Sequence, residues 1–542
     1  MGYGILGARG AGSFLRFALI FGLALESPAL TTAVPSRKQV EAAMAKATGF
    51  MMDTVSARGG FVWKYSLDLK ERYGEIGVKT RDTMTWVQEA GTPGVGMMLI
   101  EAWKATGDRR YLEWADRAAG VLIWGQLPTG GWNYLIDFDP AGTRNYYETC
   151  FWRTFGWEEY LHYYGNATFD DGNTADATRF LMRLYEATGD SKYREPLLKA
   201  LQCILDAQYP NGAWPQRWPL KSDFPHGDYE ADGTPAKDYT ACYTMNDKVC
   251  ENNIEVLFEA ARVLGREEYL QAARRGMDFY IIAQQPSPQA GWAQQYDMDM
   301  KPAWGRRFEI NTVCTGDTLE CIRGLLKFYK MTGDRRYLEP IPKALAWLKT
   351  TVIDTDADGA TYVTYFYEPG TNRPIYTRRV GKDFRDYHFI LTYDPNGAYP
   401  YGVHYPMDIA GQGREFERVR ALDGAAARAE YDKEAADRTH PPIYINRLAD
   451  QRGAEEVFKS KTVMNFLNRV NGMGDYSMEA KDAREIHELI LSMDQRGAWV
   501  TDVEVINPDD CINIPPKKFK GYDTCTYIAR MYRFINYLKG LG

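Results

Sequence analysis

Hydrophobic residues recur at helical spacing in paired blocks along most of the chain. In each pair, one amphipathic helix is predicted to end at a Thr-Gly-Asp turn, and a second begins near a Tyr and leads to a Gly-x-Trp loop. The clearest copies end at Trp132 and Trp214, a degenerate copy ends at Trp292, a further copy has its turn at Gly333, and a fragment ends at Trp499. The pattern therefore predicts a repeat of helix pairs.

The turn between the two helices of a pair has a physical explanation. Gly107, Gly189 and Gly333 can adopt the left-handed conformation that ends a helix, and the Asp that follows each can cap the next helix. These turns recur about every 70–80 residues, and one pair cannot bury both faces of its helices, so neighbouring pairs must stack. We therefore predict an all-α protein, an α/α toroid of antiparallel helix pairs in a single domain over residues 34–542.

Two regions depart from this pattern. Residues 359–405 are rich in Tyr, Thr and Pro and lack a helical period, which predicts short strands and long loops. Residues 412–440 are rich in Ala, Arg and Glu, which predicts an inserted, charged surface helix.

The start of the chain is typical of a secretory signal peptide. Arg9 and Arg16 precede an apolar run over residues 17–25 that is too short to span a bilayer, and small residues follow up to about Ala33. We expect residues 1–33 to be removed and the protein to be secreted or periplasmic.

Composition narrows the functional classes. The 542 residues are 45% hydrophobic and 25% charged, which is ordinary for a folded protein, and the net charge of −7 argues against a nucleic-acid or anionic-membrane binder. Aromatic residues make up 14% of the chain, as expected for many packed helices or for a cleft that stacks sugar rings. We expect a monomer that does not associate with membranes.

The eight cysteines allow two interpretations. Cys242 and Cys250, and Cys511 and Cys525, are close enough in sequence to form disulfides in an oxidising compartment. The alternative is that most of them are small buried side chains. Neither a CxxC pair nor a zinc-like His spacing occurs.

Three loops carry candidate chemistry. Residues 167–174 hold Asp170 and Asp171 before a helix, where they are either caps or ligands of a hard cation. Residues 243–248 also precede a helix, and residues 292–309 are dense in cations, carboxylates and aromatics, which is typical of a binding cleft or of a solvated charged face. Loops on a rigid scaffold are where sites occur, so we expect these loops to gather at one end of the toroid.

Four collinear motifs then resemble one enzyme family. The runs 209–216 (YPNGAWPQ), 245–247 (MND), 304–309 (WGRRFE) and 370–375 (GTNRPI) are similar in order and spacing to the pectate lyases of polysaccharide lyase family 10. The likeness covers about residues 165–405, and the segment from Trp86 resembles a longer branch placed beside that family. The chain thus looks like a divergent, N-terminally longer member.

The resemblance implies an α/α toroid that cleaves polygalacturonate, or a related uronate polymer, by β-elimination with the help of Ca²⁺. It places Asp247 beside the substrate carboxylate and the metal, and makes Arg379, or as second choice Arg373, the base that removes the C5 proton. It further implies a set of substrate-binding residues and a set of metal ligands. The substrate-binding residues are Asn246, Lys248, Trp214, Arg217, Tyr296 and Arg306, and the metal ligands are Asp170, Asp171 and Asp247.

These residue types suit the reaction. Removing the C5 proton builds negative charge on the neighbouring carboxylate, and cations aimed at it stabilise that charge. An arginine base is unusual because the guanidinium pKa is about 12.5 or higher. Arg379 therefore has a second possible role, as a clamp on the substrate carboxylate.

Three other functions are compatible with the sequence. An inverting glycoside hydrolase could use Glu148 or Asp170 together with Asp247, provided the carboxyl groups lie about 6.5–9.5 Å apart. A non-catalytic glycan-binding protein could stack sugars on the loop tryptophans Trp132, Trp214 and Trp292. The Gln-x-x-x-Gly-x-Trp loops also resemble those of triterpene cyclases. For the tryptophans, packing between helices is the simpler interpretation, except for Trp214, which the family motif places close to the cleft.

Overall fold

The computed structural model of the chain describes residues 34–139, 165–220, 239–306, 308–357, 359–381, 388–398, 403–437, 483–505 and 517–541. The predicted signal peptide lies outside these residues, as do Glu148, Cys150 and Cys511. Within these ranges, none of the helices combines the length and the apolar character that spanning a bilayer requires.

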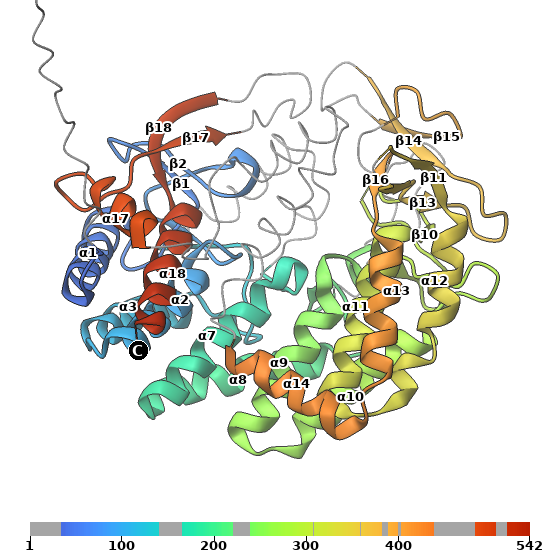
Figure 1. Cartoon of the computed structure of the whole chain (residues 1–542), viewed down its shortest axis with the longest axis horizontal. Coiled ribbons are helices and arrows are strands. Elements are labelled where there is room, and N and C mark those ends of the chain that lie inside the picture. Colours follow the sequence, from blue (N-terminus) through green and yellow to red (C-terminus); the bar gives the residue numbers. More distant parts are fainter. Residues whose placement is uncertain are drawn as a thin grey trace, which may run out of the picture.

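Four consecutive antiparallel helix pairs follow one another around an arc (Figure 1). They are α2 (Thr92–Thr106) with α3 (Arg110–Gly125), α7 (Asn173–Thr188) with α8 (Arg194–Ala207), α9 (Val249–Leu264) with α10 (Glu267–Ile282), and α11 (Thr315–Thr332) with α12 (Ile341–Thr350). The first helix of each pair is buried along most of its length, whereas the second buries only one face. The first helices therefore form an inner ring and the second helices an outer ring, which confirms the α/α toroid.

The predicted turns have the predicted conformation. Gly107, Gly189, Gly265 and Gly333 all have φ between 65° and 73°, and each ends an inner helix in the left-handed region. The carboxylate of Asp190 accepts a hydrogen bond from the backbone N–H two residues later, and Asp108 and Asp334 do the same.

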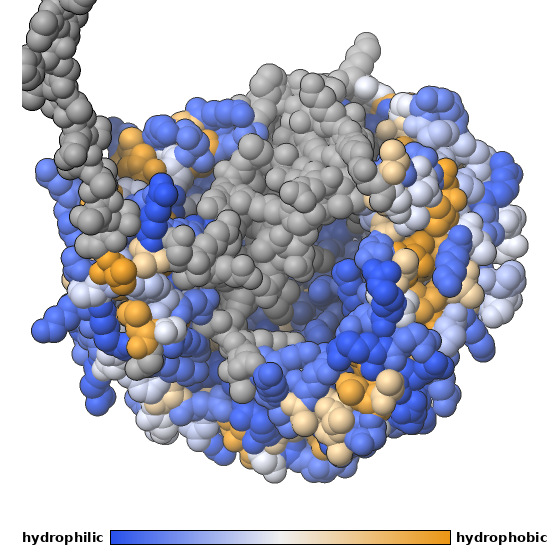
Figure 2. All heavy atoms as spheres, in the orientation of Figure 1, coloured by the Kyte–Doolittle hydropathy of each residue, from blue (hydrophilic) through white to orange (hydrophobic). Residues whose placement is uncertain are grey.

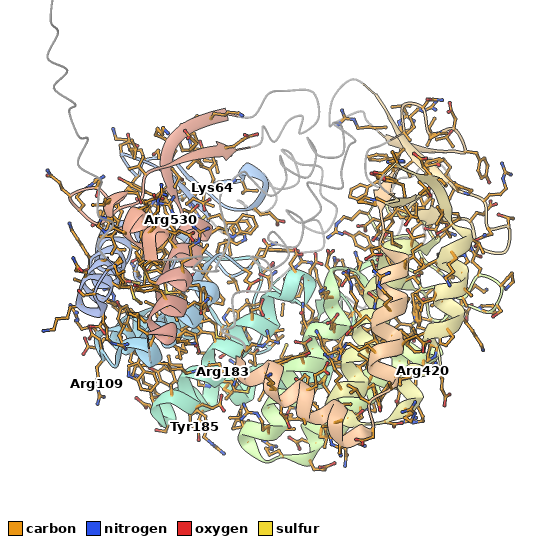
Figure 3. All side chains as sticks on the ribbon, viewed as in Figure 1. Lys64, Arg109, Arg183, Tyr185, Arg420 and Arg530 are labelled. Carbon is orange, nitrogen blue, oxygen red and sulfur yellow. The ribbon has the colours of Figure 1, made fainter. Side chains whose placement is uncertain are left out.

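The two ends of the chain form a further pair. The N-terminal helix α1 (Arg37–Phe50) packs against the C-terminal helix α18 (Thr524–Gly540), and the hydroxyl of Tyr527 donates to Thr48 Oγ1 at 3.0 Å. Strand β1 (Lys64–Ser66) pairs with β18 (Lys517–Asp523) in a five-stranded sheet ordered β17-β18-β1-β2-β3. The other strands of this sheet are β2 (Arg72–Tyr73), β3 (Lys79–Thr80) and β17 (Thr501–Val505), and helix α17 (Ala483–Leu491) lies against α1 and α18. In Figure 3, Arg530 is labelled on α18 and Lys64 on β1.

A short antiparallel ladder joins the two ends of each helix pair. The ladders are β4 (Met84–Trp86) with β5 (Leu135–Asp137), β6 (Ala167–Thr168) with β7 (Arg217–Trp218), β8 (Tyr243–Thr244) with β9 (Gln295–Tyr296), and β10 (Val313–Cys314) with β13 (Phe366–Tyr367). The first strand of each ladder leads into the N-terminus of an inner helix. The loops before the inner helices therefore lie on one rim of the ring.

The Gly-x-Trp loops pack between helices. Trp132, Trp214 and Trp292 are fully buried, and each indole N–H donates at 2.8 Å to a carbonyl of the outer helix before it. Trp499 makes the same kind of bond at 3.1 Å. The packing interpretation is confirmed for the loop tryptophans, and the expectation that Trp214 stacks a sugar is wrong because its ring has no exposed face.

Short strands replace helices in residues 359–405, as predicted. β12 (Thr361–Val363) pairs with β11 (Val352–Thr355) and β16 (Tyr405–Pro406), and β14 (Tyr376–Val380) pairs with β15 (His388–Thr392). The charged region that follows forms α13 (Ile409–Arg420) and α14 (Gly424–Asp437). Helix α14 lies against α11, where Lys330 Nζ contacts Glu434 at 2.6 Å. In Figure 3, Arg420 marks the end of α13.

Among the described residues, five cysteines are free, buried thiols: Cys203, Cys250, Cys314, Cys321 and Cys525. Cys250 Sγ donates to the carbonyl of Thr244 at 3.1 Å. The proposed disulfide between Cys242 and Cys250 is therefore wrong, and Cys525 is likewise unpaired.

Candidate active site

Two neighbouring rim loops have the same unusual backbone. The short helical turns Asp170–Gly172 and Asn246–Lys248 precede α7 and α9. Asp171 has φ 49° and ψ 23°, and Asp247 has φ 49° and ψ 24°. A non-glycine residue held at positive φ is strained, and such strain concentrates at functional sites. The repeat therefore presents two aspartates in matching, constrained positions.

The aspartates of these loops converge. Asp170, Asp171 and Asp247 each place a carboxylate oxygen within 4.8 Å of the others. The phenol of Tyr134 donates to Asp170 Oδ2 at 2.5 Å, and the amide of Gln88 donates to Asp171 Oδ2 at 2.8 Å. The predicted metal ligands are thus brought together, and two donors from the preceding helix pair orient them.

Arg306 links this cluster to a fourth carboxylate. Its guanidinium donates to Asp170 at 3.0 Å, to Asp247 at 3.3 Å and to Glu309 at 2.8 Å. The backbone N–H of Arg306 also donates to Glu309 at 3.0 Å. Burial raises the pKa of Glu309, and the charge of Arg306 opposes that shift. A single guanidinium therefore partly balances a strongly acidic site.

The donor set fits a hard divalent cation. Ca²⁺ binds carboxylate and carbonyl oxygens at about 2.3–2.6 Å, so two ligands of one ion lie within about 5 Å of each other. Asp170, Asp171 and Asp247 meet that limit and offer oxygen atoms only. The positively charged Arg306 already contacts Asp170 and Asp247. A bound metal ion would therefore share these carboxylates with Arg306 or replace its hydrogen bonds to them. The side chain of Asn246 adds a buried Oδ1 that has no hydrogen-bond partner among the described residues.

The two candidate bases lie in different surroundings. Arg379 is on β14, opposite Phe389 of β15, and the ring of Phe389 lies 5.9 Å from that of Phe308, two residues from Arg306. Arg373 instead lies over the ring of Tyr393 at 3.8 Å, on an exposed turn. The structure therefore places Arg379 within the β14–β15 ladder and Arg373 on the exposed turn that precedes it.

The remaining predicted substrate contacts divide into two groups. Lys248 lies on the rim next to Asp247 and forms an ion pair with Glu320 at 3.2 Å. Tyr296, by contrast, has no exposed surface, and its hydroxyl accepts a hydrogen bond from a backbone N–H inside the core. The expectation that Tyr296 contacts substrate is wrong, for the same reason as for Trp214. Arg217 is also buried, but none of its guanidinium nitrogens has a partner among the described residues.

A further acidic group lies on the same rim. Asp317, in the first turn of α11, accepts a hydrogen bond from the phenol of Tyr365 at 2.8 Å. Burial raises the pKa of Asp317 to about 7, the hydrogen bond from Tyr365 opposes the shift, and nearby carboxylates including Asp247 add to it. Gly316 permits this arrangement, because a Cβ there would lie 2.3 Å from the ring of Tyr365.

Sequence reasoning missed Gln88, Tyr134, Glu309 and Asp317 as site residues. Gln88 and Tyr134 come from the first helix pair, so only the repeat geometry connects them to Asp170. One signal was available: Tyr134 stands two positions after a loop tryptophan, where Gln216 and Gln294 stand in the next two units.

The charged residues below the rim are paired. Arg179 on α7 bonds to Asp176 at 2.6 Å and to Glu259 at 3.1 Å, and Arg183, labelled in Figure 3, bonds to Glu259 at 2.8 Å. In Figure 2, hydrophilic residues border the lower and right-hand sides of the hollow in the middle of this face.

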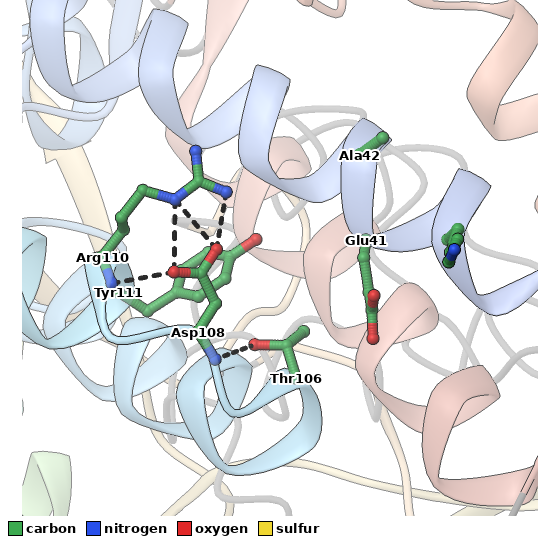
Figure 4. A pocket seen from close by; sticks show the side chains of 7 residues that line it. Glu41, Ala42, Thr106, Asp108, Arg110 and Tyr111 are labelled. Carbon is green, nitrogen blue, oxygen red and sulfur yellow. Dashed lines mark hydrogen bonds and ion pairs between the residues drawn. The ribbon is translucent and has the colours of Figure 1, made fainter.

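A separate pocket of about 250 Å³ lies at the other end of the helices. It is lined by the turn after α2 and by α1, and its Asp108 is already bonded to Arg110 (Figure 4). Helix α2 has 15 residues, so its two ends are roughly 22 Å apart. This pocket is not part of the acidic site.

A comparison with protein families covers the part of the chain that holds the acidic site. Residues 157–351, a little over a third of the chain, match the family model described as pectic acid lyase, and this stretch holds the three aspartates, Arg306 and Asp317. The match supports a pectate-lyase-like enzyme of the polysaccharide lyase class. No curated protein matches the sequence.

Solved structures resemble the chain only distantly. A mutant family 10 polysaccharide lyase from Cellvibrio cellulosa, in complex with trigalacturonic acid, is 20% identical, with 51% of this chain and 85% of that chain covered and a TM-score of 0.36. A glycoside hydrolase family 76 mannosidase from Bacteroides thetaiotaomicron is 9% identical, with 93% and 97% covered and a TM-score of 0.38. These scores are too low to define a shared fold, so the toroid stands on the chain's own helices.

Proposed function

We propose that the protein is an exported polysaccharide lyase that cleaves polygalacturonate, or a related uronate polymer, by Ca²⁺-assisted β-elimination. The observation that carries the proposal is the convergence of Asp170, Asp171 and Asp247 around Arg306, within the stretch that matches the pectic acid lyase family model. The trigalacturonic acid bound to the Cellvibrio enzyme gives the class of substrate to try first.

The site residues have distinct roles in this reaction. Asp170, Asp171 and Asp247 would hold Ca²⁺, which supplies positive charge against the substrate carboxylate as the C5 proton leaves. Tyr134 and Gln88 fix the orientation of two of these carboxylates. Arg306 keeps the carboxylates close together and presents a guanidinium beside them.

Arg379 is the candidate for proton abstraction or for clamping the substrate carboxylate. Elimination then breaks the C4–O bond, and the electron pair of the C5–H bond forms the C4–C5 double bond. A guanidinium acts as a base only where its pKa is strongly lowered, whereas a clamp uses its ordinary charged form. Arg379→Lys keeps the positive charge but removes the planar guanidinium with its two parallel N–H donors. This variant should therefore lose most activity in either role.

The inverting hydrolase is less well supported. Its mechanism needs about 6.5–9.5 Å between the two carboxyl groups, so that a water fits between them. Asp170 and Asp247 approach within 4.8 Å, which is too close for that pair. Glu148, the other candidate acid, lies outside the described residues.

Product analysis tests the proposed function. Purified protein without residues 1–33 is incubated with polygalacturonate, alginate and a neutral galactan, with Ca²⁺ or with a chelator. The proposal predicts products with a C4–C5 double bond, each lighter by one water than a hydrolysis product, from polygalacturonate or another uronate polymer. Saturated products would show a hydrolase, and no change in any polymer would show that the protein is not a lyase of this class.

A further inference from the structure

Arg217 is a charged side chain buried without a partner. Only 1% of the residue is exposed, and its Nε, Nη1 and Nη2 atoms all lack a hydrogen-bond partner among the described residues. Burying an unpaired charge is strongly unfavourable, and buried arginines normally have carboxylates beside them. Arg179 and Arg306 follow that rule, since both are bonded to carboxylates. Arg217 therefore needs an anion that the described part of the protein does not supply.

The position of Arg217 connects it to the acidic site. It lies on β7, directly opposite Thr168 of β6. The N–H of Phe169 donates to the carbonyl of Gln216 at 2.8 Å, and the N–H of Asp170 donates to Thr168 Oγ1 at 3.2 Å. The strand that carries Arg217 is thus bonded to the segment that carries Asp170. The backbone of Arg217 therefore lies beside the backbone that leads into Asp170.

The fold does not require a cation at this position. The equivalent position, three residues after the loop tryptophan, is Leu135 in the preceding unit and Gln295 in the following one. Both are uncharged, and both pair with the same strand position of their own ladders. The charge of Arg217 is therefore particular to the unit that also contributes Asp170 and Asp171.

We propose that the guanidinium of Arg217 binds a carboxylate of the substrate and forms a buried ion pair with it. The inference rests on the proposed function, because it takes the ligand to be a uronate chain. A planar guanidinium matches a carboxylate with two parallel hydrogen bonds, and such a pair is strongest away from water. The three aspartates repel an acidic polymer, so a guanidinium that is not already bonded to the protein's own carboxylates gives that polymer a point of attachment.

Removing the charge should separate binding from stability. Arg217→Met keeps much of the side-chain volume and removes an unpaired buried charge, so the unliganded protein should unfold at the same or a higher temperature. Its affinity for trigalacturonate should fall by about tenfold or more, because a charge-assisted, two-pronged contact is lost. A residue with a merely structural role would give the opposite result for stability. Arg217→Lys keeps the charge but loses the planar guanidinium. Its affinity for trigalacturonate should therefore lie between that of wild type and that of Arg217→Met.

The matched control is Gln295→Met, at the equivalent position of the next unit. Binding is measured by calorimetric titration with trigalacturonate in Ca²⁺, or as KM where the trimer is turned over, with galactotriose as the neutral ligand and inorganic sulfate as a simple anion. We expect Gln295→Met to bind trigalacturonate as tightly as wild type does. The affinity for galactotriose should be the same for wild type and for every variant. If sulfate binds wild type as well as trigalacturonate does, the site is a general anion site and the assignment to uronate is wrong.

The outcomes separate the inference from the proposed function. If wild type neither binds nor cleaves any galacturonate oligomer, the proposed function fails and this inference fails with it. If wild type binds trigalacturonate and Arg217→Met binds it equally well, only the inference is overturned. A lower unfolding temperature of Arg217→Met with unchanged affinity would show that Arg217 serves the fold.

Discussion

At the scale of single residues, the paired conformations of Asp171 and Asp247 are the most informative feature. Both residues are held at φ 49°, in the left-handed region that favours glycine. Asn and Asp are the non-glycine residues that tolerate this region best, which explains why the chain can place a ligand there. The local backbone therefore supports a role in chemistry over a role in capping.

Asp247→Asn should remove activity and leave the fold intact. Asn adopts the left-handed conformation as readily as Asp, so the loop keeps its shape while the site loses a charge. We expect activity on the polymer to fall by about 100-fold or more, as when one electrostatic contact to a transition state is lost. The thermal midpoint should stay within a few degrees.

Asp190→Asn is the control for this change, because Asp190 caps a 3-10 turn between α7 and α8, at the opposite end of α7 from the acidic rim. Asn caps as well as Asp, so this variant should be fully active and equally stable. Wild-type activity in Asp247→Asn would show that Asp247 is not part of the site.

Asp317 gives the protein a measurable pH dependence of stability. Its folded pKa of about 7 lies above the ordinary value of 3.8, so the folded state holds more protons than the unfolded state between these values. Its contribution to stability is therefore present below pH 4 and is lost as pH rises towards 7, by up to about 1.4 kcal/mol per pH unit. Asp317→Asn should gain stability relative to wild type between pH 5 and pH 8.

Denaturant unfolding at pH 5 and pH 8 checks this prediction, with Asp299→Asn on an exposed side chain as control. The control should differ from wild type by the same amount at both pH values. If Asp317→Asn also shows no change with pH, then the Asp317 carboxyl is not protonated in the folded protein at pH 5.

At the scale of elements, the helix pairs show how much the sequence determines. The turn glycines, their capping aspartates and the burial of the loop tryptophans follow from local backbone and packing physics, and all were predictable. What the sequence could not settle was the direction in which aromatic residues face. Tyr296 lies on β9 and Trp214 lies three residues before β7, but both side chains are fully buried. Gln88 and Tyr134 were missed because they act on the next unit along.

Gly212 tests the packing of these loops. It has φ 97°, and a Cβ there would lie 2.0 Å from the carbonyl oxygen of Arg275 on the next outer helix. Gly212→Ala should therefore destabilise the protein by about 2–4 kcal/mol, because it adds a steric clash to the cost of positive φ.

Gly189→Ala is the matched control, because Gly189 also has positive φ but has open space around its Cβ position. It should cost only about 1 kcal/mol, from the backbone alone. Equal costs for the two variants in chemical denaturation would contradict the close contact between neighbouring units.

At the scale of the whole molecule, the two ends of the chain complete one unit together. Helix α1 packs on α18, and β1 pairs with β18, so the first and last described elements depend on each other. The inner helix α18 is buried along most of its length. Stability should therefore be shared around the ring.

Removing residues 524–542 should abolish cooperative folding of the remainder. The deletion exposes the apolar faces of α1 and α2, which both pack against α18. Circular dichroism during heating should show a broad transition or an insoluble protein, whereas full-length protein unfolds sharply. A truncated protein with the same thermal midpoint would show that the ends are independent of the ring.

The central claim is that the acidic rim is the site of a Ca²⁺-assisted elimination. The most direct measurement follows the ultraviolet absorbance of the C4–C5 double bond while wild type and Asp247→Asn act on polygalacturonate, first with Ca²⁺ and then with a chelator. The account predicts a rise in absorbance for wild type with Ca²⁺, which the chelator stops and Asp247→Asn does not produce. A rise that is the same in Asp247→Asn, or cleavage of the polymer without any rise, would contradict it.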